Sequence, residues 1–285
     1  MRIMISALVA VFPLLSSVAL AAEDSGIVAA AQLAEKSLNA QVGLTVIDTR
    51  DGRTWSYREN ERFPMASTFK AVACGALLDA GDKALSTKVT IEKKDLLEYA
   101  PATKKRVGQK ITAAELCQET LRTSDNTAAN KVLEVLGGPQ AVTAFLRKIG
   151  DTTTRLDRNE PELNESKPGD ERDTTTPAAM ANTLKTLLLG NALPPADRAQ
   201  LKDWLIADEV GGPLLRAGVP ASWIIADRTG AGGFGTRGVI AVMWPPKREP
   251  IVAAVYMTGT KASMDDRNRA IAEIGQAIAE AVSQR

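Results

Sequence analysis

The segments with strand character lie at the two ends of this chain, and a long helix-like stretch separates them. Apolar residues alternate from Val42 to Val46, and Asp51-Gly52 gives a hairpin turn signal before Arg53–Tyr57 returns. Strand-like runs rich in Ile, Val and Trp come late, at Trp223–Asp227, Val239–Trp244 and Ile251–Met257. The last segment has apolar residues at helical spacing, at Ile271, Ile274, Ile278 and Val282.

This distribution predicts an α/β fold (an α+β sandwich), in which a mixed, mainly antiparallel sheet is flanked by helices. We expect residues 22–60 and 207–285 to form the sheet lobe together, and residues 61–206 to form an inserted all-helical lobe. Residues 155–173 show little periodicity, which is typical of a functional Ω-loop. The cleft between two such lobes is a usual place for a site.

The first residues have the pattern of an export signal. Arg2 supplies a positive charge, an apolar run follows, and Ala19-Leu20-Ala21 fits a cleavage site, so we expect a signal peptide over residues 1–21. A retained membrane anchor is the alternative. Export predicts a periplasmic protein, with no membrane association once the signal is removed. In an oxidising compartment Cys74 and Cys117 are able to pair, although two buried free thiols would also fit.

Histidine is absent from all 285 residues. This excludes Ser-His-Asp and Cys-His catalysis within the chain and every zinc site that uses histidine. Two cysteines alone do not make the usual structural zinc site, and we expect neither metal nor cofactor. The net charge of +1 gives no reason to expect nucleic acid as a partner. Proton transfer must then rely on Ser, Lys, Tyr, Asp or Glu.

Ser67-Thr68-Phe69-Lys70 begins a mostly apolar run that ends at Gly81. A helix over this run places Ser67 and Lys70 on one face near its N-terminus, where backbone N–H groups favour developing negative charge. A lysine in apolar surroundings can lose its proton and activate a serine. The alternative is a helix cap beside a solvated charge.

Three further motifs follow in order. Ser124-Asp125-Asn126 precedes a helix-like run and also reads as a cap. Glu160 and Asn164 lie four residues apart in the Ω-loop, which could equally be a charged surface loop. Arg228-Thr229-Gly230 follows a predicted strand, and its simpler reading is a strand end.

Together, S-x-x-K, S-D-N, E-x-x-x-N and a basic-Thr-Gly triplet resemble the motif set of the class A serine β-lactamases. The resemblance covers the mature chain and implies the fold shared with penicillin-binding proteins. It also includes Cys74, Tyr99, Cys117, the stretches 155–158 and 170–173, and 264–268. Arg228 stands where the family usually has Lys, and an Arg-Thr-Gly triplet is similar to the carbenicillin-hydrolysing subgroup.

The resemblance implies a role for each catalytic residue. Ser67 would attack the β-lactam carbonyl, and Lys70, or Glu160 through a water, would take its proton. Ser124 would pass a proton to the leaving ring nitrogen. The backbone N–H groups of Ser67 and Ala231 would form the oxyanion hole. Glu160 and Asn164 would hold and activate the deacylating water.

The resemblance also implies the substrate contacts, at Tyr99, Asn126, Asn164, Arg228, Thr229, Gly230, Ala231 and Arg237. Arg228, Thr229 and Arg237 would bind the substrate carboxylate, and Gly230 would allow close approach to the backbone. Asn126 would contact the acylamino side chain and Tyr99 would wall the entrance. Arg158 and Asp173 would form the ion pair that closes the Ω-loop. We expect a monomer acting on small β-lactams. A penicillin-binding transpeptidase or carboxypeptidase and a β-lactam sensor are the alternatives.

Overall fold

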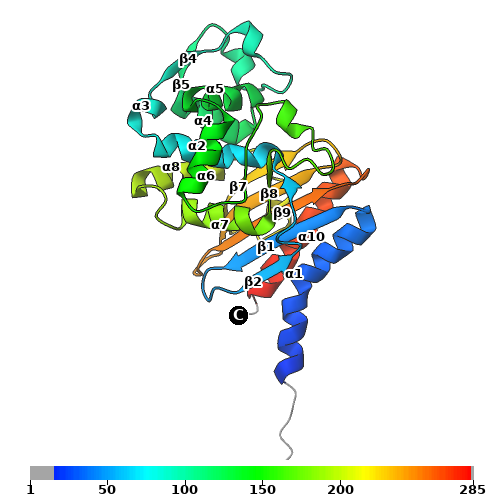
Figure 1. Cartoon of the computed structure of the whole chain (residues 1–285). Helices are drawn as coiled ribbons and strands as arrows, with labels where there is room; N and C mark the ends of the chain where they lie inside the picture. Colours follow the sequence, from blue (N-terminus) through cyan, green and yellow to red (C-terminus); the bar gives the residue numbers. More distant parts are fainter. Residues whose placement is uncertain (1–15, 284–285) are drawn as a thin grey trace, which may run out of the picture.

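The computed structural model describes residues 16–283, and its centre is a five-stranded sheet in the order β2-β1-β9-β8-β7 (Figure 1). The strands are β1 (Gln41–Asp48), β2 (Thr54–Tyr57), β7 (Ile224–Ala231), β8 (Arg237–Trp244) and β9 (Ile251–Thr258). All four pairings are antiparallel. Each strand predicted from the sequence is present, and both ends of the chain contribute to one sheet.

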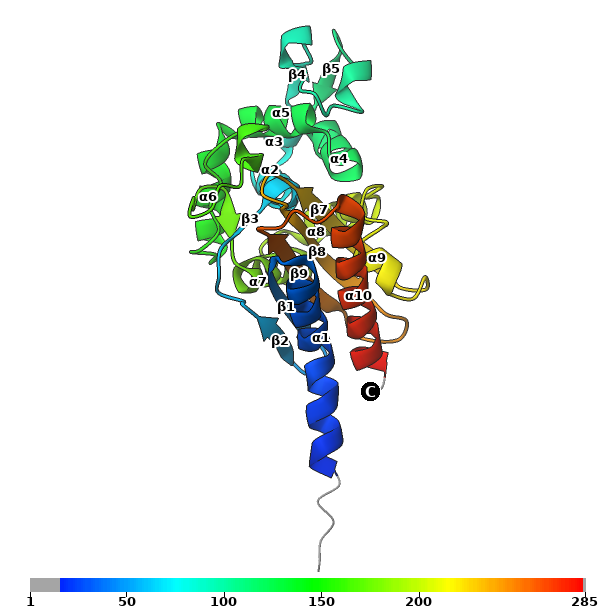
Figure 2. The same ribbon diagram turned by 90° about the vertical axis from the view of Figure 1, so that its right-hand side faces the viewer.

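Helices cover both faces of this sheet because its strands alternate between two cores. Along β8, Val239, Ala241 and Met243 point to one face, whereas Ile240 and Val242 point to the other. The first face is covered by α1 (Ser16–Leu38), α9 (Leu215–Gly218) and α10 (Met264–Ser283), with α1 and α10 side by side (Figure 2). The second face packs on α7 (Pro177–Leu188) and the helical part of the chain. The predicted α/β sandwich is confirmed.

The helical part is built around α2 (Phe69–Asp79), in which Phe69 to Leu78 are all buried. The other helices here are α3 (Asp82–Leu85), α4 (Ala113–Thr123), α5 (Asn126–Leu136), α6 (Pro139–Lys148) and α8 (Pro195–Ile206). Single 3₁₀ turns occur at η1 (Ala66–Thr68), η2 (Lys93–Asp95), η3 (Thr103–Lys105) and η4 (Glu162–Asn164). A disulfide joins Cys74 of α2 to Cys117 of α4, with their Cα atoms 5.6 Å apart, so the two cysteines are paired and not free thiols.

Two short ladders stand in the stretch that the sequence predicts to be all-helical. β3 (Phe63–Pro64) pairs with β6 (Thr174–Thr175), and β4 (Lys88–Thr90) pairs with β5 (Lys110–Thr112). Strands of two or three residues are too short to show an alternating pattern, which is why the sequence does not reveal them. The first ladder ties the end of the Ω-loop to the segment just before Ser67.

The N-terminal helix runs through the predicted cleavage site. Helix α1 is already present at Ser16, the first residue that the structure describes, and continues to Leu38. Most of the predicted signal peptide, residues 1–15, lies outside the described residues. Within residues 16–283 no helix combines the length and the apolar character needed to cross a bilayer.

Candidate active site

Ser67 lies in the η1 turn that leads into α2, at the junction between the sheet and the helical part. The backbone of β7 lies against this turn: a Cβ on Gly230 would come within 2.7 Å of the Met65 carbonyl oxygen and 3.1 Å of the Ser67 nitrogen. A residue without a side chain is therefore required at position 230. The close approach places Ala231, the next residue of the strand, on the wall of the same cleft as Ser67.

Lys70 is the polar centre of the site, and its side chain is completely buried. Its Nζ lies 2.9 Å from Ser67 Oγ, 3.2 Å from Ser124 Oγ and 2.6 Å from Asn126 Oδ1. It also donates to the Ser124 carbonyl at 2.8 Å and lies 3.2 Å from Glu160 Oε1. One amine thus contacts residues from three of the four sequence motifs.

Burial lowers the pKa of Lys70, the Glu160 carboxylate opposes this shift, and the positive charge of Arg228 adds to it; the net result is a pKa of about 8 instead of 10.5. A lysine with this pKa is roughly one-tenth neutral at pH 7. The neutral amine has a free lone pair, and at 2.9 Å it can accept the proton of Ser67 directly. The site therefore contains a serine with a basic group in hydrogen-bond contact.

The S-D-N motif contains both a helix cap, Asp125, and a candidate catalytic residue, Ser124. Asp125 caps α5 through Ala128 N and also accepts hydrogen bonds from Ala102 N and Thr103 N, so it is a structural cap. Ser124 has a left-handed backbone with φ of 64° between α4 and α5, and this turn aims its hydroxyl at Lys70.

The Ω-loop carries Glu160 to Lys70, and the residue that holds Glu160 is Asn130 of α5. Asn130 Nδ2 donates to the Glu160 carbonyl at 2.8 Å, and Glu160 N donates to Asn130 Oδ1 at 2.9 Å. The sequence analysis missed Asn130. Its position four residues after Asn126, on the same helix face, is the signal that could have found it. The Glu160–Pro161 peptide that follows is cis.

Asn164 faces Glu160 from the next turn, η4, and its Nδ2 donates to Glu160 Oε2. Asn164 Oδ1 is buried and has no hydrogen-bond partner among the described residues. Glu160 itself is 2 % exposed. The two side chains therefore form one hydrogen-bonded unit, in which Asn164 Oδ1 remains able to accept a hydrogen bond.

Ionic contacts close the base of the Ω-loop as expected. Arg158 Nε lies 2.5 Å from Asp173 Oδ2, and the fully buried Asp173 also accepts from the backbone N–H groups of Asp157 and Arg158. Arg158 reaches Glu165 at 2.9 Å in addition. A buried carboxylate with three donors is well satisfied, so this pair joins the two ends of the loop.

Arg237 and Thr229 supply the candidate anion-binding end of the cleft. Arg237 donates to Asn268 Oδ1 at 2.8 Å and to the Gly230 carbonyl at 3.1 Å, which fixes its guanidinium on the wall. Burial, with the charges of Arg267 and Arg228, lowers its pKa to about 10, so Arg237 remains a cation at neutral pH.

Arg228 differs from the expectation that it contacts the substrate carboxylate or marks a strand end. It lies inside β7, paired with Ile240 of β8, and its side chain is fully buried. Its Nη1 donates to the Leu121 carbonyl at 2.7 Å and lies 3.5 Å from Asp208 Oδ1. β7 continues four residues beyond the predicted end at Asp227, and this extension puts the cation beneath the cleft.

The cleft above these residues has a volume of about 390 Å³. It is lined by Ser67, Tyr99, Ser124, Asn126, Asn164, Val210, Thr229, Gly230, Ala231, Arg237 and Met264. Tyr99 is half-exposed at the rim. Lys70 and Glu160 lie behind this lining, and Val210 and Met264 are lining residues that the sequence analysis did not identify. Within residues 16–283 no cluster of His, Cys, Asp or Glu could hold a metal ion.

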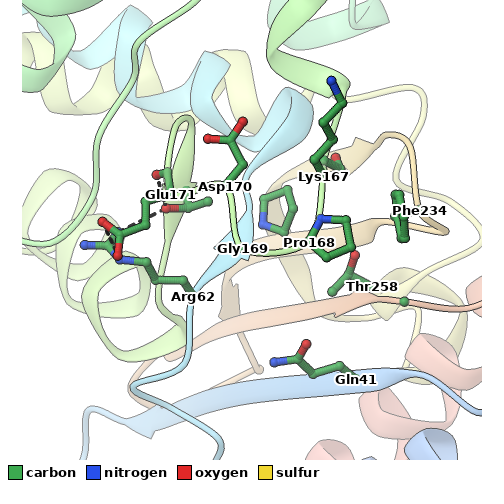
Figure 3. A pocket seen from close by; sticks show the side chains of 13 residues that line it. Gln41, Arg62, Lys167, Pro168, Gly169, Asp170, Glu171, Phe234 and Thr258 are labelled. Carbon is green, nitrogen blue, oxygen red and sulfur yellow. Dashed lines mark hydrogen bonds and ion pairs between the residues drawn. The ribbon is translucent and has the colours of Figure 1, made fainter.

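A second and larger cavity, of about 480 Å³, lies between the outer half of the Ω-loop and the adjacent ends of β1 and β9 (Figure 3). Its lining includes Lys167, Pro168 and Glu171 of the loop and Gln41 and Thr258 of the sheet. In Figure 3 Pro168 lies on the side of the loop toward the strands, whereas Glu171 turns to Arg62. Ser67 and Lys70 do not line it. Choosing the candidate site by cavity volume alone would therefore have selected a cavity that does not contain the nucleophile.

The fold and the cleft define a serine acyl-transfer enzyme in which a buried lysine, and not a histidine, lies next to the nucleophile. Comparison with known proteins gives the particular family. The family model described as "Beta-lactamase enzyme family" matches residues 28–282. The chain belongs to this family, as a class A serine β-lactamase.

Curated relatives and solved structures agree with this assignment. Beta-lactamase AER-1 of Aeromonas hydrophila is 48% identical over 267 residues, which cover 92% of this chain and 88% of the relative. Beta-lactamase CARB-4 of Pseudomonas aeruginosa is 50% identical, with 90% of each chain covered. An ancestral (GNCA) class A β-lactamase structure is 55% identical with a TM-score of 0.86, covering 88% of this chain and 97% of that one. The chromosome-encoded enzyme of Vibrio parahaemolyticus is 44% identical with a TM-score of 0.86, covering 89% and 98%.

Proposed function

We propose that this enzyme hydrolyses the β-lactam ring of penicillins, including carboxypenicillins, through an acyl-enzyme on Ser67, and so gives resistance to them. The observation that carries the proposal is the Glu160–Asn164 unit beside Lys70, because it adds a means of deacylation to a serine that can be acylated. The Arg228-Thr229-Gly230 triplet, similar to that of the carbenicillin-hydrolysing subgroup, supports the choice of carboxypenicillins.

In the acylation step, Ser67 Oγ attacks the ring carbonyl while its proton passes to neutral Lys70, or to Glu160 through a water. The Ser67 and Ala231 N–H groups would stabilise the resulting oxyanion. The C–N bond then breaks, and Ser124 donates its proton to the ring nitrogen. Ser124 Oγ lies 3.2 Å from Lys70 Nζ, so the lysine can return the proton it took from Ser67.

In the deacylation step, Glu160 would accept a proton from a water held by Asn164. The hydroxide attacks the ester carbonyl, and Ser67 leaves with a proton. The spare oxygen of Asn164 provides an acceptor for that water. A penicillin-binding protein or a sensor is acylated in the same way but stays acylated for much longer.

Recognition of the substrate would use both ends of the cleft. Arg237 and Thr229 would hold the carboxylate, with Arg228 contributing positive potential from below. Asn126 would contact the acylamino group, and the exposed Tyr99 would wall the entrance. Asn126 Oδ1 is bound to Lys70 Nζ, so its Nδ2 is the group left to donate to the substrate.

The placement of the enzyme in the cell is part of the proposal. Residues 1–21 would direct export and be removed, and the mature enzyme would act as a monomer in the periplasm. We divide the mature chain into a sheet lobe of residues 22–60 and 207–285 and a helical lobe of residues 61–206. The Cys74–Cys117 disulfide supports an oxidising compartment.

Mass spectrometry of a Glu160→Ala variant tests the proposal. With benzylpenicillin, the variant should form an adduct on Ser67 that persists for minutes, whereas the parent enzyme should be free of adduct once substrate is consumed. Ser67→Ala is the matched control and should form none. A parent enzyme that itself remains acylated would show a penicillin-binding protein or a sensor instead, and a variant that turns over normally would remove Glu160 from deacylation.

A further inference from the structure

The position of Tyr99 at the cleft entrance is set by its backbone. Its side chain is half-exposed, and its hydroxyl forms no hydrogen bond with another of the residues that the structure describes. The Tyr99 carbonyl accepts a hydrogen bond of 3.0 Å from the backbone N–H of Asn126, the first residue of α5. The ring therefore stands where residues 95–99, the entrance segment, are placed against α5.

Thr127, the next residue of α5, holds the entrance segment through its hydroxyl. Its Oγ1 accepts a hydrogen bond from Leu97 N at 2.9 Å and donates one to the Asp95 carbonyl at 3.2 Å. The Thr127 side chain is buried, so water cannot readily replace either bond. One hydroxyl thus satisfies a donor and an acceptor of the backbone that leads to Tyr99.

Lys131, one helical turn further along α5, holds the same segment by charge. Its Nζ lies 3.0 Å from Asp95 Oδ2 and 2.8 Å from Glu134 Oε2. The side chains of Lys131 and Asp95 are only 12% and 14% exposed, whereas Glu134 is mostly exposed. Burial lowers the pKa of Lys131, but its hydrogen bonds to Glu134 and Asp95 outweigh this effect and raise it, so Lys131 is a cation at neutral pH. The sheltered pair with Asp95 is the one that joins the helix to the entrance segment.

These polar contacts lie in the wall of a cavity of about 450 Å³. Thr127 and Lys131 line it from α5, and Asp95 and Leu97 line it from the entrance segment. Open space on this side provides no apolar packing that could replace a lost contact. Asn130, which holds Glu160, lines the same cavity. Neighbouring residues of one helix therefore support the cleft entrance and the candidate deacylation base.

We propose that Thr127 and Lys131 are specificity-determining positioning residues, which fix Tyr99 at the entrance and so limit the size of the acylamino side chain that the cleft admits. Neither residue lines the cleft, so each acts through the entrance segment. Loss of either support lets this segment move away from α5 and widens the entrance. The effect on specificity rests on the proposed function, whereas the attachment of the segment does not.

Hydrogen exchange of the substrate-free protein tests the attachment. In Lys131→Met and in Thr127→Val, which keep the approximate size of each side chain, the amides of residues 95–99 should exchange about two- to tenfold faster than in the parent enzyme. Glu134→Gln is the matched control, because it removes the exposed partner of Lys131 and keeps the pair with Asp95, and its exchange should match the parent. Unchanged exchange in Lys131→Met, a substitution near the surface, overturns the proposal even if Thr127→Val does not fold.

Steady-state kinetics with benzylpenicillin and cefotaxime, which has a bulkier acylamino side chain, tests the effect on specificity. The ratio of kcat/KM for benzylpenicillin to that for cefotaxime should fall about two- to tenfold in Lys131→Met and in Thr127→Val. The change should come mainly from a lower KM for cefotaxime, with kcat for benzylpenicillin unchanged. In a Tyr99→Ala background the same substitutions should leave the ratio as it is, because the side chain through which they act is gone.

Two results would overturn the role in specificity: a ratio that does not change, and a ratio that changes equally with and without the Tyr99 side chain. The second result would show that Lys131 and Thr127 act on the protein as a whole. A parent enzyme that hydrolyses neither substrate would refute the proposed function, and the role in specificity with it. The exchange experiment uses no substrate, so it would still report the attachment of the entrance segment.

Discussion

Replacing Glu160 by Gln separates the two candidate bases for acylation. Glu160 Oε1 lies 3.2 Å from Lys70 Nζ, and neither side chain is exposed to solvent. The carboxylate therefore holds the pKa of Lys70 above the value that burial alone would set. Gln has nearly the same shape as Glu but no charge, so the substitution removes this support while the packing is kept.

The size of the effect follows from the distance. At an effective dielectric constant of about 20, unit charges 3.2 Å apart attract each other by about 5 kcal/mol, or between about three and four pKa units. A hydrogen bond donated by Lys70 Nζ to the oxygen of the new amide recovers part of this, and we expect the pKa of Lys70 to fall from about 8 by about one to three units. Because a lower pKa leaves more lysine neutral at a given pH, at least about half of Lys70 would be neutral at pH 7.

Single-turnover stopped-flow with nitrocefin, across the neutral and alkaline range, measures this directly. If Lys70 is the base, the inflection in the acylation rate should move from near pH 8 to lower pH in Glu160→Gln, and acylation at pH 7 should be at least about fivefold faster. Deacylation should stall. Asn164→Ala is the matched control, because it disturbs the water site but keeps the charge of Glu160. An unmoved inflection, or acylation slowed at every pH, would refute Lys70 as the base and favour Glu160.

Three further substitutions test the supports of the site. Asn130→Ala removes two hydrogen bonds to the Glu160 backbone, worth about 1 kcal/mol each, and should slow deacylation more than acylation in pre-steady-state kinetics. Equal loss in both steps would contradict a specific role for Asn130. Arg158→Ser leaves the buried Asp173 uncompensated, at a cost of about 3–5 kcal/mol. Faster proteolysis of the Ω-loop, lower penicillin turnover and entry of bulkier cephalosporins should follow, and unchanged cleavage and kinetics would argue against the pairing. Cys117→Ser opens a bridge that spans 43 residues, and denaturant unfolding should show a loss of about 4 kcal/mol or less. Two free thiols in the denatured, unreduced parent protein would show instead that the bridge does not form.

Contacts between residues that are close in the sequence were the ones that could be predicted from it. Ser67 and Lys70 are three residues apart at a helix start, so their contact follows from helical geometry. The order of the four motifs predicted their common cleft through the family resemblance. Alternation, the Asp51-Gly52 turn signal and runs rich in Ile, Val and Trp together predicted the strands of the main sheet, because each strand has at least four residues.

Contacts between segments that are far apart in the chain could not be predicted from the sequence. The expected strand ended at Asp227, and nothing local shows that β8 pairs with the next four residues and draws Arg228 into the interior. The burial of Asp208 against the same strand is invisible for the same reason. Asn130 could be identified as important only once the Ω-loop was seen folded over α5. Each of these depends on how two remote pieces of chain meet.

The nucleophile and the deacylation apparatus are attached to the molecule in different ways, and this affects how the enzyme can evolve. Ser67 and Lys70 stand at the start of α2, where Phe69 to Leu78 are buried, so changes there put the folding of the entire protein at risk. Glu160 is held by side-chain amides and by ion pairs at the loop base, and none of the residues that supply these contacts belongs to α2. Selection by new antibiotics can therefore act on the loop, trading turnover of one substrate for access by another, while the acylating serine stays in place.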